Sequence, residues 1–149
     1  MEANTVVITG MGIISPIGKT IEEFSKNLFL NKSGAKKIER FETAELPTRI
    51  ACEVKEYHSH YRDIKIPFAL DAAREAMTMA NFSPSELKEL NSQLSIGIGL
   101  ELFALEDLIE YQKDSPLNYF DKEILHFLNT PSDLCCHLIS KEHYLNQAP

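Results

Sequence analysis

The sequence is poor in positive charge, and this shortage excludes one large class of function. Its 149 residues carry 15 lysines and arginines against 22 aspartates and glutamates, which gives a formal net charge of −7. Proteins that bind nucleic acid unaided need surplus lysine and arginine to displace counterions from phosphate. The one basic run, residues 32–40, is interrupted by Glu39, and we interpret it as a solvated loop. We therefore expect no nucleic-acid partner.

Long apolar runs and paired cysteines are also missing. No apolar stretch approaches the roughly 20 residues needed to cross a bilayer, and the first residues lack the charged and apolar segments of a signal peptide. Cysteines occur only at Cys52, Cys135 and Cys136, and this odd number favours reduced thiols over a disulfide framework. We expect a cytoplasmic protein with no membrane partner, and a single domain without repeats or linkers.

The residues that are present have the composition of a globular α/β domain, with 44% apolar and 25% charged residues. Runs of β-branched or alternating apolar residues predict a buried strand at 5–9, a half-buried strand at 48–55 and a third strand at 94–100. Helical periodicity and capping residues predict helices starting after Thr20 and Ser83, at 67–80 and 102–112, at 119–127, and from a cap at 130–133 to about 144. This alternation predicts an α/β layer fold with a mostly parallel sheet.

The turn after the first predicted strand raises the question of nucleotide binding. Gly10 and Gly12 begin a glycine-rich pattern, but Ser15 occupies the third glycine position and Pro16 follows at once. A dinucleotide turn needs a helix that starts inside G-x-G-x-x-G, so that the helix N-terminus meets the pyrophosphate. Here the first helix cap is Thr20, several residues too late. A nucleotide-dependent enzyme stays as the weakest hypothesis, and we expect no cofactor.

The same residues resemble the N-terminus of the β-ketoacyl synthases, the condensing enzymes of fatty-acid and polyketide synthesis. The family's first strand and turn read V-V-(I/V)-T-G-x-G-x-(I/V)-S-P-(I/L)-G, and "VVITGMGIISPIG" at residues 6–18 follows this pattern. Less specific matches are "RFETAELPTRIACEV" from Arg40, "FALDAAREAM" from Phe68 and "TPSDLCCHLISKEHYLNQAP" from Thr130. The resemblance spans essentially the whole chain, although the link between Tyr57 and Pro67 is shorter than usual in the family.

This resemblance implies a partial thiolase-like fold, in which residues 1–149 form an N-terminal β-ketoacyl synthase domain that is incomplete at its C-terminal end. They would supply most of the N-terminal βαβαβ half, with a mostly parallel sheet and packed helices. The intact family condenses an acyl thioester with malonyl carrier protein, binds acyl carrier protein and forms homodimers. The resemblance places its nucleophilic cysteine, its histidines and its lysine after Pro149. We therefore expect no catalytic residue, no metal and no activity from this chain alone.

One candidate substrate contact follows from a departure from the family. The family often has a glycine-rich G-(S/T)-G-x-G loop after its third strand, where it lines the acyl pocket. This chain has "GLELFALED" at residues 99–107 instead, with the bulky side chains of Leu102 and Phe103. By resemblance, these two residues are the candidate substrate-binding positions. Acyl chain length and starter unit stay open, as does the choice between a free-standing synthase and a polyketide synthase domain.

The remaining candidate groups have both a functional and a structural interpretation. Cys135, Cys136 and His137 invite a metal or nucleophile hypothesis, but adjacent helical residues point about 100° apart, so we favour packing. We interpret Cys52 as a small buried hydrophobe. Other possible ligands or acids lie in a predicted loop (His58 and His60) and on a predicted helix (Glu101, Glu106, Asp107 and Glu110), and we favour solvation for both groups. We interpret His126 and His143 as ordinary surface or interface residues.

Two hypotheses for the chain therefore remain prominent. The first is an N-terminal fragment of a β-ketoacyl synthase, which is inactive alone. The alternative is a non-catalytic, synthase-like binding module that contacts a carrier protein or a synthase subunit. Under the first hypothesis, unpaired sheet edges and bare apolar faces predict that the isolated chain aggregates, is partly molten or needs a complementing chain.

Overall fold

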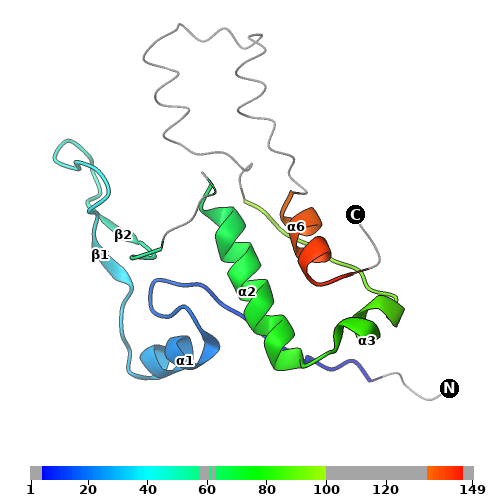
Figure 1. The fold of residues 1–149 in the computed structure, drawn as a ribbon. Helices are drawn as coiled ribbons and strands as arrows, with labels where there is room; N and C mark the ends of the chain where they lie inside the picture. The colour runs from blue at the N-terminus through cyan, green and yellow to red at the C-terminus, as the bar shows by residue number, and fades with distance from the viewer. Residues whose placement is uncertain (1–4, 58–60, 62, 100–133, 146–149) are drawn as a thin grey trace, which may run out of the picture. The chain divides into compact units, whose positions relative to one another are not determined.

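The computed structural model of the chain describes residues 5–57, 61, 63–99 and 134–145. Its elements, in chain order, are α1 (Ile21–Phe29), β1 (Ala35–Lys37), β2 (Ile50–Cys52), α2 (Lys65–Ala80), α3 (Pro84–Glu89) and α6 (Leu134–Glu142) (Figure 1). The chain divides into two compact units, one of residues 1–58 and 71–81 and the other of residues 59–70 and 82–149. Helix α2 contributes residues to both units.

Helix α1 begins and ends where its capping residues predict. The Thr20 hydroxyl accepts a hydrogen bond from the Glu23 amide at 3.2 Å. The Glu23 carboxylate in turn accepts from the Lys19 amide at 2.9 Å, one residue before the position expected for a capping box. After the helix, Asn31 adopts a left-handed conformation with φ of 53°, which is a common helix ending for asparagine. The sequence predicts a helix stop at residues 31–34, and the structure confirms it.

The strands β1 and β2 form an antiparallel pair, which is the one sheet among the described residues. Their register pairs Ala35 with Cys52, Lys36 with Ala51, and Lys37 with Ile50. The predicted strand at 48–55 is therefore confined to its central residues, and the predicted solvated loop at 32–40 contains a strand. Cys52 is exposed, as is Ile50 on the same face of the strand, so its interpretation as a buried hydrophobe is wrong.

The predicted buried strand at residues 5–9 is also wrong for the described structure. These residues are exposed and pair with no described strand. Residues 94–99 likewise form no ladder, although their partial burial alternates along the segment. Strand propensity describes how well a side chain fits a pleated, half-buried surface. Since the described residues offer these segments no neighbouring strand, the mostly parallel sheet is not observed.

The helices α2 and α3 follow their sequence signals closely. Helix α2 starts at Lys65, two residues before the predicted Pro67, and runs to Ala80 as expected. Helix α3 has a complete capping box, in which the Ser83 hydroxyl and the Glu86 carboxylate each accept from the other residue's amide. Both predicted helices are confirmed. The predicted helices at 102–112 and 119–127, and the cap at 130–133, lie outside the described residues.

The described apolar core belongs to the second unit. Its buried apolar side chains come from three helices and are Ile66, Leu70, Leu87, Cys135, Cys136 and Ile139. Most of the large apolar side chains that are exposed instead lie in the first unit, as do Val6, Phe29 and Phe41. Within the described ranges, no helix combines the length and apolar character needed to cross a membrane. The two units therefore differ sharply in how much apolar surface they bury.

Replacing two leucines of the second unit with alanine should distinguish a core position from a surface position by the loss in the free energy of unfolding. Leu70 is 5% exposed, whereas Leu90 is 44% exposed. We expect Leu70→Ala to lower the free energy of unfolding by about 2–4 kcal/mol, because it leaves a cavity in the core. Leu90→Ala serves as the matched control, with an expected loss below about 1 kcal/mol. Urea titrations followed by circular dichroism measure both values, and equal losses would contradict the described core.

Candidate functional site

The glycine corner, which we define as residues 10–18, packs its backbone directly on helix α2. A β-carbon added to Gly10 would lie 2.0 Å from the carbonyl oxygen of Ala76, and one added to Gly12 would lie 1.8 Å from that of Ala72. No glycine among the described residues has a positive φ. Glycine is therefore needed in this part of the corner for close approach, and not for an unusual backbone conformation.

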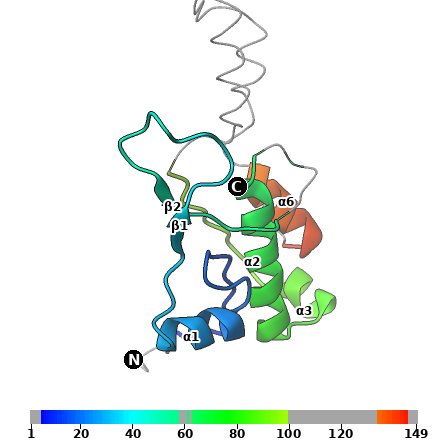
Figure 2. The ribbon, with the colours of Figure 1, turned by 90° about the vertical axis from the view of Figure 1, so that its left-hand side faces the viewer.

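The small side chains of α2 make this approach possible. Ala72, Ala76 and Ala80 recur every fourth residue and lie on one stripe of the helix. Gly10 and Gly12 lie against this stripe, so the extended trace that precedes α1 runs beside α2 (Figures 1 and 2). The small residues at positions 67–80 of the sequence predict a stripe suited to close packing on a sheet or another helix. The structure confirms the close packing, but the partner is the glycine corner.

One carboxylate fastens the glycine corner to α2. The Ile13 amide donates a hydrogen bond to Oε2 of Glu75 at 3.0 Å, and the Ile21 amide donates to Oε1 at 2.7 Å. Ile21 is the first residue of α1, where backbone amides have no partner within the helix. A negative charge at this position also interacts favourably with the helix dipole. Glu75 therefore occupies the helix N-terminus that a phosphate would need in a nucleotide site.

A tight turn closes the glycine corner. The backbone amides and carbonyls of Ser15 and Gly18 bond to each other at 2.9 and 3.3 Å, and the Ser15 hydroxyl also donates to the Gly18 carbonyl. A β-carbon at Gly18 would lie 2.3 Å from the Phe24 amide nitrogen, so this position also needs glycine for space. Asn27 of α1 donates its side-chain amide to the Ile17 carbonyl at 2.5 Å. The turn is therefore held by its own backbone and by α1.

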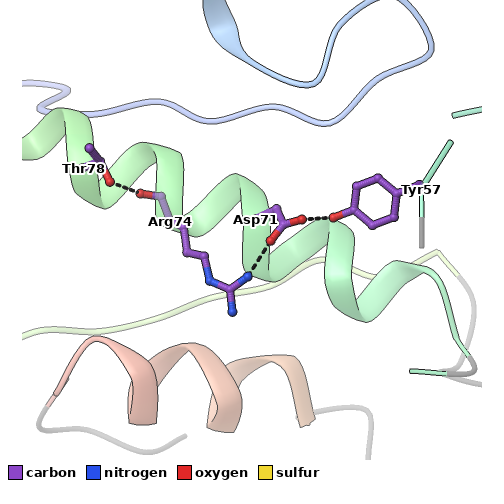
Figure 3. Close-up of polar contacts among 4 residues, drawn as sticks. All are labelled: Tyr57, Asp71, Arg74 and Thr78. Atoms are coloured by element: carbon purple, nitrogen blue, oxygen red, sulfur yellow. Dashed lines mark hydrogen bonds and ion pairs between the residues drawn. The ribbon is translucent and has the colours of Figure 1, made fainter. Parts of the chain in front are cut away.

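A second polar network joins the segment after β2 to α2 (Figure 3). The Tyr57 hydroxyl donates to Oδ2 of Asp71, while Arg74 donates to Oδ1 of the same carboxylate at 2.5 Å. The Thr78 hydroxyl donates to the Arg74 carbonyl at 2.7 Å. Burial, followed by the hydrogen bond and charge of Asp71, raises the pKa of Tyr57 well above its usual range. Tyr57 therefore stays protonated near neutral pH and serves as a structural donor.

Lys19 links the glycine corner to this network. Its ammonium group donates to the Glu56 carbonyl at 3.1 Å and lies 5.9 Å from the centre of the Tyr57 ring. Glu56 has a φ of 53°, a left-handed conformation that is uncommon for glutamate. The strained backbone at Glu56 is thus held between Lys19 on one side and the Tyr57 contact with α2 on the other.

The first unit contains a polar cavity of about 480 Å³ beside the turn. Its charged lining residues are Lys19, Lys32, Lys36, Lys55, Glu23, Glu53 and Glu56. Binding sites for apolar ligands are lined mainly by apolar and aromatic side chains. A lining of lysines and glutamates therefore does not suit an acyl chain, and the mixed signs give no strong preference for an anion.

The paired cysteines of α6 are packing residues. Cys135 and Cys136 are both buried. Burial raises the pKa of Cys135, and the nearby Cys136 and Asp63 raise it further. Asp63 is itself buried and forms an ion pair with the Lys65 ammonium at 2.7 Å. A buried thiol with a raised pKa is a poor nucleophile, which supports the packing interpretation of this pair.

Among the described residues, the predicted metal-ligating and acid–base candidates do not form a common site. His137 is exposed whereas its two cysteine neighbours are buried, so the three cannot share one ion. Across the described parts of the chain, no group of three or more histidine, cysteine and acidic side chains is arranged to hold a metal. His143 is partly buried near the end of α6. The candidates His58, His60, Glu101, Glu106, Asp107, Glu110 and His126 lie outside the described residues.

The predicted substrate contacts Leu102 and Phe103 also lie outside the described residues. The sequence motifs assigned no role to Glu75 or to the Tyr57–Asp71 pair. Glu75 carried a weak signal, because it is an acidic residue directly before an alanine of the small-residue stripe of α2, a position that it shares with Asp71. The pairing of Tyr57 with Asp71 had no such signal, since it depends on how the segment after β2 meets the helix. Glu75 and the Tyr57–Asp71 pair therefore serve packing and hydrogen bonding within the first unit.

The sequence matches the family described as "Beta-ketoacyl synthase, N-terminal domain" over residues 3–135. A similar relative is the 3-oxoacyl-[acyl-carrier-protein] synthase 2 of Coxiella burnetii, which is 32% identical over 109 residues. That match covers 67% of this chain and 26% of the relative. The chain thus spans about a quarter of the length of the curated relatives it matches.

Comparison with solved structures also finds ketosynthases. The structure titled "The ishigamide ketosynthase/chain length factor" is similar with a TM-score of 0.63 and 25% identity, over 94% of this chain and 37% of that one. A ketosynthase bound to a hexaketide, in complex with its type II polyketide synthase acyl-carrier protein, matches with a TM-score of 0.58 and 21% identity, over 95% of this chain and 36% of that one. The second likeness concerns the fold alone.

Two glycine substitutions should test the close packing of the glycine corner. We expect Gly12→Ala to lower the free energy of unfolding by about 1–3 kcal/mol, because its β-carbon would overlap the Ala72 carbonyl. Gly97→Ala is the control, since no atom lies within 4 Å of its added carbon, and its effect should stay within about 0.5 kcal/mol. Thermal and urea unfolding measure the difference. A tolerated Gly12→Ala would contradict the described contact.

The three cysteines should differ in reactivity. We expect exposed Cys52 to react with Ellman's reagent within the mixing phase at pH 8, whereas Cys135 and Cys136 react only as the chain opens. The raised pKa of Cys135 slows it further, because less of this thiol is ionised at a given pH. Cys52→Ser should remove the fast phase and leave the slow one. A fast reaction of all three thiols would mean that α6 does not bury its cysteines.

Proposed function

This chain belongs to the β-ketoacyl synthase family, whose N-terminal domain matches residues 3–135, and on that premise we propose that it is the N-terminal part of a condensing enzyme. The enzyme it belongs to joins an acyl thioester to malonyl carrier protein in fatty-acid or polyketide synthesis. The observation that carries this proposal is the family match over nearly the whole chain, together with a glycine corner whose residues have a defined structural task. Curated relatives named 3-oxoacyl-[acyl-carrier-protein] synthases support it.

The fold is a partial thiolase-like fold, as its similarity to ketosynthase structures indicates. We propose in addition that residues 5–9 and 94–99 become strands of a mostly parallel sheet in the intact domain. Two features support this. The first segment is rich in β-branched residues, and the second alternates between partly buried and exposed side chains. Neither segment has a described strand partner, so a sheet would need neighbouring strands that the described residues do not supply.

We propose that the chain has no condensing activity by itself. Acyl transfer through a cysteine needs an accessible thiol whose pKa is lowered by a helix N-terminus or a neighbouring cation. Cys135 is buried and its pKa is raised, and Cys136 is also buried. Cys52 is exposed, but it lies on strand β2 and not at the start of a helix. None of these thiols meets the requirements for the reaction.

The proposed substrate and partners belong to the whole enzyme. The acyl group would be delivered by acyl carrier protein, as the names of the relatives suggest. Leu102 and Phe103 would contact the acyl chain, because they replace the glycine-rich loop of the family. The polar cavity beside Lys19 is not a candidate site for the acyl chain, since its lining is charged. We also propose a cytoplasmic setting with reduced thiols, and a homodimer of the intact synthase.

The proposal predicts restoration of activity by a complementing fragment. We would co-express the 149-residue chain with the Coxiella burnetii relative from which the matching N-terminal segment has been removed. The expected result is a stable complex that converts acyl and malonyl carrier proteins into a 3-oxoacyl carrier protein, detected by mass spectrometry. Each part alone should give no product above background. The Gly12→Ala variant should reduce the yield of active complex, whereas Gly97→Ala should not.

Different outcomes separate the two functional hypotheses. Condensation by the isolated chain would contradict its proposed inactivity. Failure of the two parts to associate, with folded parts confirmed by circular dichroism, would contradict the fragment proposal. Binding of acyl carrier protein by the isolated chain, without any condensation in the complemented complex, would instead identify a non-catalytic binding module.

A further inference from the structure

Two ends of one short segment are bound by the same carboxylate. The Ile13 amide donates to Oε2 of Glu75 at 3.0 Å, and the Ile21 amide donates to Oε1 at 2.7 Å. Both hydrogen bonds are partly buried. A single side chain of α2 therefore closes the backbone between these two amides into a loop, and we call residues 13–21 the strap.

Between its two ends, the strap makes its hydrogen bonds away from α2. The backbone groups of Ser15 and Gly18 bond to each other, and Asn27 of α1 donates to a carbonyl of the strap. Lys19 bonds to α1 through its amide and to the segment after β2 through its ammonium group. The structure describes two hydrogen bonds between the strap and α2, and Glu75 accepts both.

The chain directly before the strap is held by a different kind of contact. Gly10 and Gly12 pack against the carbonyls of Ala76 and Ala72, and this close approach needs no carboxylate. The strap follows this contact as the blue loop beside α2 in Figure 2. Loss of the two bonds to Glu75 would therefore free the strap and the first turn of α1, while the backbone at Gly12 stays in place.

An ionised carboxylate suits both amides better than any neutral side chain of the same size. An amide in the first turn of a helix has no partner within the helix, and a buried amide without an acceptor costs free energy. A carboxylate offers two acceptor oxygens, whereas a glutamine side chain offers one oxygen and an NH₂ group that is itself a donor. Glu75→Gln would thus leave one amide of the strap unpaired, although both residues have similar helix propensity.

We propose that Glu75 is the latch of a conformational device, in which one carboxylate holds the strap and the first turn of α1 closed on α2, and both open together when its hydrogen bonds are lost. The device has a hinge after Gly12, with a movable part that begins at Ile13. The proposal depends on contacts inside the first unit and not on any exposed surface. It does not rest on the proposed function.

Amide hydrogen exchange, followed residue by residue by NMR on the 149-residue chain, tests the latch. We expect Glu75→Gln to speed exchange of the Ile13 and Ile21 amides by the same factor, at least about tenfold, because one local opening exposes both. The Ala73 amide lies inside α2 and should keep its wild-type rate, since α2 stays folded when the strap opens.

Glu22→Gln is the matched control for charge. Glu22 is exposed in the first turn of α1, so this change removes the same charge near the same helix N-terminus and leaves both bonds to Glu75 intact. We expect exchange of the Ile13 and Ile21 amides to change by at most about threefold, through the helix dipole alone. Equal acceleration by Glu22→Gln and Glu75→Gln would assign the effect to charge and overturn the latch.

Acetate rescue tests whether the strap amides recognise a carboxylate. Glu75→Ala removes one methylene and the carboxylate, which together match the carbon and oxygen atoms of acetate. Sodium acetate should slow exchange of the Ile13 and Ile21 amides in this variant by at least about threefold relative to sodium chloride of equal ionic strength. It should leave the wild type unchanged, because Glu75 already occupies the position. Propionate is one carbon larger and should act more weakly.

Several results would overturn the proposal. One is rapid, unprotected exchange of the Ile13 and Ile21 amides in the wild type. Others are acceleration of only one of these amides by Glu75→Gln, or equal acceleration at Ala73, which would mean that Glu75 supports the whole fold and not a local latch. Failure of acetate to slow exchange in Glu75→Ala, with the fold confirmed by circular dichroism, would show that the two amides do not bind a carboxylate.

Discussion

The structure of the first unit depends on how closely the backbone of the glycine corner approaches helix α2. At Gly10 and Gly12 there is no room for a β-carbon, since the carbonyls of Ala76 and Ala72 occupy the space. The close contact thus requires both the small side chains of the alanine stripe on the helix and the absence of side chains at the glycines of the corner. Glu75 stabilises this contact with two hydrogen bonds, because its carboxylate accepts from one backbone amide of the corner and from the first backbone amide of α1.

This constraint changes how the glycine-rich turn should be understood. A glycine pattern after a strand suggests phosphate binding, in which the missing side chains make room for a ligand. In this chain the missing side chains make room for a helix, and a glutamate occupies the helix N-terminus where an anion would bind. The chain belongs to the β-ketoacyl synthase family, and its glycine corner packs against a helix.

Burial of apolar side chains is divided unequally between the two units. The described apolar core belongs to the second unit, whereas the first unit exposes apolar side chains such as Val6, Ile8 and Phe29. Exposed apolar surface of this kind marks interaction sites.

The sequence by itself determined the features that depend on neighbouring residues. Thr20, Ser83 and Asn31 set helix ends through contacts within a few residues, and the glycine–proline pattern identified the family. The tertiary structure decided what depends on distant partners. The β-branched run at residues 5–9 has strand propensity but no described neighbour, Cys52 lies on an uncovered ribbon, and Tyr57 meets Asp71 only when two segments come together. Burial and pairing are properties of two segments at once, so the sequence of either one alone cannot specify them.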